Sequence, residues 1–164
     1  MATFKGNVVT LTGKSVNVGD KAPEVSLVAG DLSEKKVGGA SGKFQIINVV
    51  PSLDTGVCAT QTRKFNEKAA SLPNTEVFVV SLDLPFAQGR FCSTEGIANV
   101  TALSDFKNKD FGNAYGVLLE DSPLAGLLTR AVFVVNPNGE IVHKEIVDEI
   151  TTEPNYDTAL NAVK

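Results

Sequence analysis

Three nearly continuous apolar runs, rich in β-branched residues, are the clearest pattern along the chain. They span residues 44–50, 77–82 and 131–135. Apolar runs of this length are typical of strands that are covered on both faces of a sheet. We therefore expect these three segments to form the centre of a β-sheet.

The segment between the first two runs has helical periodicity. Phe65, Ala69 and Leu72 are four and three positions apart, charged residues lie between them, and Pro73 follows. This spacing predicts an amphipathic helix over 58–71 whose apolar side packs on the sheet. Strand, helix and strand together form a β-α-β unit.

Shorter patterns predict the remaining elements. Residues 8–16 indicate short β pieces around Gly13, 25–28 indicate a further strand, and the Gly- and Lys-rich stretch 35–42 indicates a loop. Later segments predict a short helix within 83–99, a strand at 100–103, a helical turn at 107–114, a hairpin turn at 136–139 between strands 131–135 and 141–146, and a C-terminal helix that opens at 153–155.

The order of these elements points to one fold class. A β-α-β half followed by a β-hairpin and a helix is the thioredoxin-like plan. We therefore predict an α/β, thioredoxin-like fold with a central mixed β-sheet, flanking helices and an N-terminal β-hairpin extension. A length of 164 residues fits a single domain over 1–164.

Composition and charge exclude several classes of function. Hydrophobic residues make up 43% and charged residues 21%, which is ordinary for a soluble globular protein. The net charge is −4 and the basic residues are scattered, so we expect neither nucleic acid nor a membrane as partner. Residues 1–6 do not begin a signal peptide, and no apolar run approaches a membrane span. We expect a cytoplasmic protein.

The side chains for a metal site are poorly supplied. The chain has two cysteines, 34 positions apart, and one histidine. A tetrahedral zinc site needs four such ligands, and two cysteines cannot form the disulfide framework of a small secreted domain. We expect neither a metal nor a cofactor, and we expect the cysteines to be reactive.

Cys58 stands where a strand turns into a helix. The free N–H groups and the dipole of a helix N-terminus favour a thiolate over a thiol. Ionisation alone raises the thiolate population by only roughly thirtyfold at neutral pH, while the nucleophilicity of the sulfur falls. A fast enzyme must also orient an electrophile, for which the Thr55 hydroxyl, the N–H groups of Val57 and Cys58, and a guanidinium are candidates.

The residues around Cys58 resemble the active-site signature of the peroxiredoxins, Pro-x-x-x-Thr-x-x-Cys. Pro51, Thr55 and Cys58 match it position for position. The resemblance extends over nearly the whole chain, from residue 19 to residue 156. The segments 54–58, 83–88, 90–92 and 104–106 are similar to the thiol peroxidase branch, an atypical two-cysteine type.

This resemblance implies a role for each residue. Cys58 would attack the O–O bond of a hydroperoxide, giving a sulfenic acid and releasing water or an alcohol. Thr55 would hydrogen-bond the peroxide, Pro51 would shield the sulfur, and Arg130 would stabilise the thiolate and the developing charge. Without the resemblance, Arg130 would be read as a partner in a surface salt bridge.

Cys92 matches the resolving cysteine of that branch. The resemblance implies an intramolecular Cys58–Cys92 disulfide that thioredoxin reduces, hydrogen peroxide and alkyl hydroperoxides as substrates, antioxidant defence, and a homodimer. A disulfide needs Cα atoms roughly 4.4–6.8 Å apart, so we expect a local unfolding step. Gly89 and Gly96 are either its hinges or ordinary loop glycines.

Other interpretations remain open. Cys58 with His143 as base would make a cysteine hydrolase, although alternation predicts that His143 is exposed on its strand. A non-catalytic thioredoxin-fold redox sensor or binding protein is a second alternative. A general disulfide oxidoreductase is disfavoured because Cys58 does not begin a CxxC motif. Two interpretations are open for four apolar residues, which either line a pocket for hydroperoxides or belong to the core: Phe86, Phe91, Phe106 and Leu128.

Overall fold

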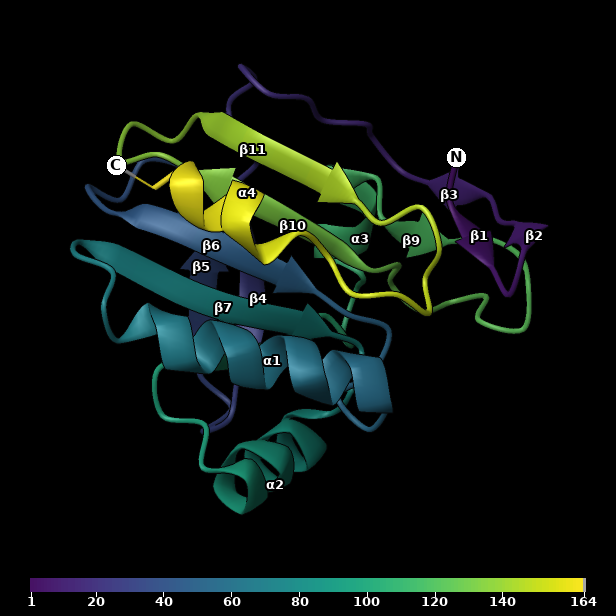
Figure 1. Cartoon of the computed structure of the whole chain (residues 1–164), viewed down its shortest axis with the longest axis horizontal. Helices are drawn as coiled ribbons and strands as arrows, with labels where there is room; N and C mark the ends of the chain where they lie inside the picture. Colours follow the sequence, from purple (N-terminus) through teal and green to yellow (C-terminus); the bar gives the residue numbers. More distant parts are fainter. Residues whose placement is uncertain (164) are drawn as a thin grey trace.

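A computed structural model, which describes residues 1–163, contains a seven-stranded mixed sheet (Figure 1). The strand order is β11-β10-β6-β7-β8-β4-β5. β6, β7 and β8 are parallel to one another, and the other neighbours pair antiparallel. The bounds are β4 Val25–Ala29, β5 Glu34–Val37, β6 Phe44–Val49, β7 Thr75–Ser81, β8 Thr101–Ser104, β10 Ala131–Val135 and β11 Ile141–Ile146.

The three apolar runs form adjacent strands inside the sheet, as predicted. They are β10, β6 and β7, and each has another strand on either side. Successive residues point to opposite faces: Ile46 and Val132 lie in one apolar cluster, and Ile47 and Phe133 lie in the other. Both faces are buried, which explains why the runs are continuous rather than alternating.

Helices cover both faces of the sheet. α1 (Gly56–Ala69) and α4 (Tyr156–Asn161) lie on one face, and α3 (Asp110–Tyr115) lies behind the sheet (Figure 1). α2 (Pro85–Glu95) lies next to α1 and packs against β8. The predicted α/β fold with a central mixed sheet is therefore confirmed.

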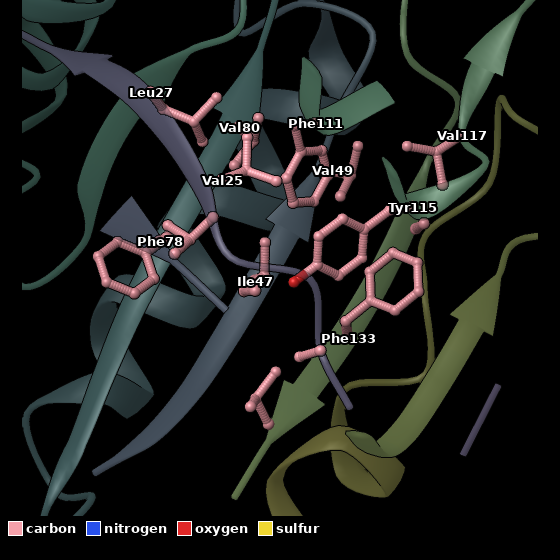
Figure 2. Close-up of a cluster of buried hydrophobic side chains, with 14 of the residues drawn as sticks. Val25, Leu27, Ile47, Val49, Phe78, Val80, Phe111, Tyr115, Val117 and Phe133 are labelled. Carbon is pink, nitrogen blue, oxygen red and sulfur yellow. The ribbon is translucent and has the colours of Figure 1, made fainter. Parts of the chain in front are cut away.

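Aromatic side chains fill the face behind the sheet. The Phe111 and Tyr115 rings stack at a centroid distance of 4.3 Å, and the Phe133 ring meets Tyr115 edge-on at 5.1 Å (Figure 2). The Tyr115 hydroxyl donates a hydrogen bond to the carbonyl oxygen of Pro23 at 2.8 Å. This core anchors α3 and leaves the opposite face to α1.

The N-terminal hairpin exists, but its predicted turn was wrong. It consists of β1 (Thr3–Phe4) and β2 (Asn7–Val8), which turn through Lys5 and Gly6 rather than at Gly13. β3 (Leu11–Thr12) instead pairs with the distant β9 (Leu118–Leu119). At Gly13 a Cβ atom would lie 2.5 Å from the carbonyl oxygen of Asn113, so this glycine permits close contact with another segment rather than a hairpin turn.

The loop predicted over 35–42 was also wrong in its first part. Residues 34–37 form β5, the edge strand next to β4. Lysines are typical of edge strands because they oppose further pairing, so the polar sequence of this strand resembles that of a loop.

The other predicted elements are confirmed with small shifts. α1 begins two residues before Cys58, β8 and α3 occupy the strand and helical turn expected near 100 and 110, and residues 136–139 form the β10–β11 turn. Asn155 caps α4 by accepting a hydrogen bond from the Thr158 N–H group at 3.1 Å. Within residues 1–163, none of the helices combines the length and the apolar character that crossing a bilayer requires.

Candidate active site

Cys58 lies in the first turn of α1 with its side chain fully buried. Between β6 and α1, the chain passes the buried Pro51 and reaches the exposed Thr55, the N-cap residue of α1. The sulfur belongs to the apolar cluster between α1 and the sheet. The start of α1 is therefore open to solvent at residues 54–56.

The first backbone N–H groups of α1 are not used by the helix cap. The Thr55 hydroxyl donates to the carbonyl oxygen of Ser52 at 3.1 Å instead of capping the helix. The Ala59 N–H group makes the first hydrogen bond of the helix, to the Thr55 carbonyl oxygen at 2.9 Å. The N–H groups of residues 56–58 precede it and have no acceptor earlier in the helix, and the helix dipole adds positive potential there.

Arg130 meets Cys58 inside the protein. Its Nη1 donates to Sγ of Cys58 at 3.2 Å and to Oε1 of Gln61 at 3.0 Å, and its Nε donates to the Ile150 carbonyl oxygen at 2.7 Å. The side chain is only 3% exposed, so the alternative of a surface salt bridge is wrong. A buried guanidinium held by neutral groups stabilises negative charge that develops beside it.

Two buried amides hold Arg130 in place, and the sequence reasoning missed both. Gln61, one turn after Cys58, donates through Nε2 to Oδ1 of Asn48 at 3.3 Å. Asn48 donates through Nδ2 to the Phe78 carbonyl oxygen at 3.1 Å. A signal was present, because Asn48 is the polar residue that interrupts the apolar run 46–50 and points to the face that α1 covers.

Cys92 lies within α2. It is partly buried at the edge of the apolar cluster that contains Cys58, and burial raises the pKa of its thiol. Both cysteines are free thiols. Gly96 ends α2 with a left-handed backbone (φ 66°), whereas Gly89 lies inside the helix. The structure thus places Cys92 in a folded helix and not in a loop.

A cleft of about 740 Å³ separates the turn before Cys58 from α2. Its wall combines apolar, cationic and anionic side chains: Leu53, Asp54, Thr55, Gly56, Ala59, Arg63, Asp83, Ala87, Arg90, Phe91, Thr94 and Glu95. The cleft reaches Thr55 and Gly56, so it leads to the free end of α1.

Of the four apolar residues considered for a pocket, Phe91 lines this cleft. Leu128 does not, because it is fully buried in the cluster on the opposite face of the sheet. Phe86 is 68% exposed and lies in the first turn of α2. Leu128 is therefore a core residue, whereas Phe91 both lines the cleft and packs against the apolar cluster that contains Cys58.

His143 lies on β11 opposite Val134, and the prediction that it is exposed was wrong. It is half-buried, its Nε2 is buried, and the structure gives that atom no hydrogen-bond partner within residues 1–163. Burial lowers the pKa of this histidine. The group that contacts the Cys58 sulfur is Arg130, which lacks a proton-accepting nitrogen, so the geometry does not favour a cysteine–histidine hydrolase.

Comparison with known proteins gives a consistent result. The family model described as Redoxin matches residues 17–160. A thiol peroxidase of Campylobacter jejuni is 57% identical over 155 residues, covering 94% of this chain and 87% of that protein. A thiol peroxidase of Halalkalibacterium halodurans is 52% identical over 162 residues, covering 99% and 96%. The solved structure of a peroxiredoxin-like protein from Aquifex aeolicus has a TM-score of 0.96 and 51% identity, covering 99% of this chain and 94% of that one.

Proposed function

This chain belongs to the Redoxin family, among its thiol peroxidases, and we propose that Cys58 is the residue with which it reduces hydroperoxides. Peroxidase activity and a part in antioxidant defence follow from that membership. The observation that carries the role of Cys58 is its contact with the buried Arg130 guanidinium at the start of α1.

The first step is an attack by the Cys58 thiolate on the hydroperoxide. Sulfur bonds to the terminal oxygen, the O–O bond breaks, and an alkoxide or hydroxide leaves and takes up a proton, giving an alcohol or water. Arg130 and the free N–H groups of residues 56–58 stabilise the charge that moves onto the leaving oxygen. Thr55 orients the peroxide at the helix start, and Pro51 keeps the turn rigid and shields the sulfur.

The second step uses Cys92. Its sulfur attacks the sulfur of the Cys58 sulfenic acid, a disulfide forms, and water leaves. Because Cys92 is partly buried within a folded helix, α2 must open locally before the two sulfurs can bond. Opening also removes the burial that raises the pKa of the Cys92 thiol, so it favours the nucleophilic thiolate.

A dithiol protein of the thioredoxin type then reduces the disulfide by exchange, and returns both cysteines to thiols. The substrates are hydrogen peroxide and alkyl hydroperoxides, for which the apolar part of the cleft, including Leu53 and Phe91, provides room. Leu84 and Phe86 expose apolar side chains at the start of α2, which supports a homodimer packed at this face. The cytoplasm, where thioredoxin keeps thiols reduced, suits this cycle.

Peroxide consumption coupled to NADPH through thioredoxin and its reductase tests the proposal. Wild-type protein should turn over many equivalents, Cys58→Ser should lose activity, and Cys92→Ser should form the sulfenic acid once without thioredoxin-dependent turnover. Unchanged activity of Cys58→Ser would refute the role of Cys58. Consumption of a single equivalent by the wild type, with no turnover, would instead favour the redox sensor.

A further inference from the structure

Asp83 joins the turn before Cys58 to the end of β7. Its carboxylate accepts hydrogen bonds from the Ser52 hydroxyl at 2.7 Å, the Leu53 N–H group at 2.7 Å and the Ser81 hydroxyl at 2.8 Å. The Ser104 hydroxyl donates to the Asp83 carbonyl oxygen at 2.5 Å, which fixes the backbone at this point. Asp83 is half-buried in the wall of the cleft. Its hydrogen bonds connect the turn before Cys58, the end of β7 and the end of β8.

The same carboxylate is connected to the helix that carries Cys92. Gln88, which is 1% exposed, donates through Nε2 to the Ser81 hydroxyl oxygen at 3.0 Å and to the Leu103 carbonyl oxygen at 2.8 Å. Ser81 in turn donates to Asp83. Gln88 lies one helical turn before Cys92 on α2. A continuous series of hydrogen bonds therefore runs from Ser52 to the helix of Cys92.

The other end of α2 is attached to α1 independently. Arg63 forms an ion pair with Glu95, and the Asn66 side-chain oxygen accepts from the N–H groups of Ala98 and Asn99 at 3.2 and 2.7 Å. Cys92 lies between these two attachments. Only the attachment through Gln88 also reaches the turn that precedes Cys58.

We propose that Asp83 is a positioning residue for both steps of the cycle, an inference that rests on the function proposed above. Its hydrogen bonds to Ser52 and Leu53 hold the turn in the geometry that peroxide attack at Cys58 requires. Asp83 also accepts a hydrogen bond from Ser81, which in turn accepts one from Gln88 of α2. This connection holds α2 folded and delays the approach of the Cys92 sulfur to the Cys58 sulfur. Asp83 thereby favours the first step and slows the second.

The substitution Asp83→Asn tests this coupling because the carboxylate accepts through both oxygens, Oδ1 from Ser52 and Oδ2 from Leu53 and Ser81. The amide keeps one acceptor oxygen and therefore cannot keep all three hydrogen bonds. Asp31→Asn is the control for the loss of a carboxylate charge, since Asp31 accepts from the Ser33 hydroxyl and N–H group through one oxygen, which the amide keeps, in the turn between β4 and β5. Rapid-quench mass spectrometry follows sulfenic acid formation in variants that also carry Cys92→Ser. It follows disulfide formation in variants that keep both cysteines.

Asp83→Asn should slow sulfenic acid formation at least about tenfold, since small displacements of a reacting group cost large factors in rate. It should speed disulfide formation by about fivefold, while Asp31→Asn changes neither rate. Ser52→Ala removes only hydrogen bonds in the turn and should slow only the first step. Gln88→Leu removes only the connection to α2 and should speed only the second step. These two variants test the proposal even if Asp83→Asn does not fold.

A purely structural role would lower the melting temperature without moving the two rates in opposite directions. Equal changes in both rates, a faster first step, or no change relative to Asp31→Asn would overturn the proposal. Cys58→Ser is measured in parallel: if it retains peroxidase activity, the proposed function fails. If it is inactive while Asp83→Asn behaves like the wild type, only the inference about Asp83 fails.

Discussion

The Nη1 atom of Arg130 lies 3.2 Å from the sulfur of Cys58, although 72 positions separate the two residues in the chain. The two side chains come from opposite sides of an interface: Cys58 from the first turn of α1, and Arg130 from the residue before β10. Gln61 and the Ile150 carbonyl oxygen hold the guanidinium so that one nitrogen faces the sulfur. The contact is therefore a property of the packed helix and sheet.

Replacement of Arg130 should slow sulfenic acid formation, and the decrease should be larger when the new side chain lacks the positive charge. Arg130→Lys keeps the charge but loses the planar set of donors that reaches Ile150, Gln61 and Cys58 together, so we expect about a tenfold decrease in the rate of sulfenic acid formation. Arg130→Gln also loses the charge and should cost about 100-fold. Equal rates in Arg130→Gln and the wild type, in a Cys92→Ser background, would contradict the role given to Arg130.

Disulfide formation should accelerate as the pH rises from 7 to 9. Burial raises the pKa of the Cys92 thiol above its ordinary value of 9.0 while α2 is folded. The folded helix therefore resists ionisation of Cys92. As the pH rises past the pKa of this thiol in the open helix, folded α2 loses stability relative to open α2, and the second step becomes faster. Stopped-flow measurement of the second step checks this, and a rate that is independent of pH would contradict it.

His143 should make the protein less stable in mild acid. Burial lowers its pKa, so the unfolded chain binds a proton that the folded chain does not, and stability falls as the pH drops below about 6.5. His143→Gln should reduce the change in the free energy of unfolding, measured with urea, between pH 7 and pH 5. The same variant should retain peroxidase activity, and a loss of activity at pH 7 would revive the hydrolase alternative.

Tyr115→Phe should affect stability and leave the chemistry unchanged. The substitution removes the hydrogen bond to the Pro23 carbonyl oxygen, behind the face of the sheet that carries α1, and should cost about 1 kcal/mol in the free energy of unfolding. Urea unfolding measures this cost. A decrease in the rate of sulfenic acid formation comparable with that of Arg130→Lys would show that the two faces are coupled.

Local patterns were sufficient for most of the fold. Continuous apolar runs located β6, β7 and β10, and the spacing of Phe65, Ala69 and Leu72 located α1, because burial and helical periodicity act between residues that are close in the chain. The same patterns misplaced the N-terminal turn and missed β5. The partner of β3 is more than a hundred positions away, and an edge strand rich in lysine carries the composition of a loop.

By itself, the sequence determined that Cys58 lies at the start of a helix behind a stiff turn and that Arg130 directly precedes a core strand. Only the tertiary structure decided that the Arg130 guanidinium reaches the sulfur and that Asn48 and Gln61 support it. It alone brought Asp83 to Ser52 across 31 positions. Helix and strand formation depend on neighbours in the chain, whereas these hydrogen bonds exist only after distant segments have closed on one another and buried their polar groups in register.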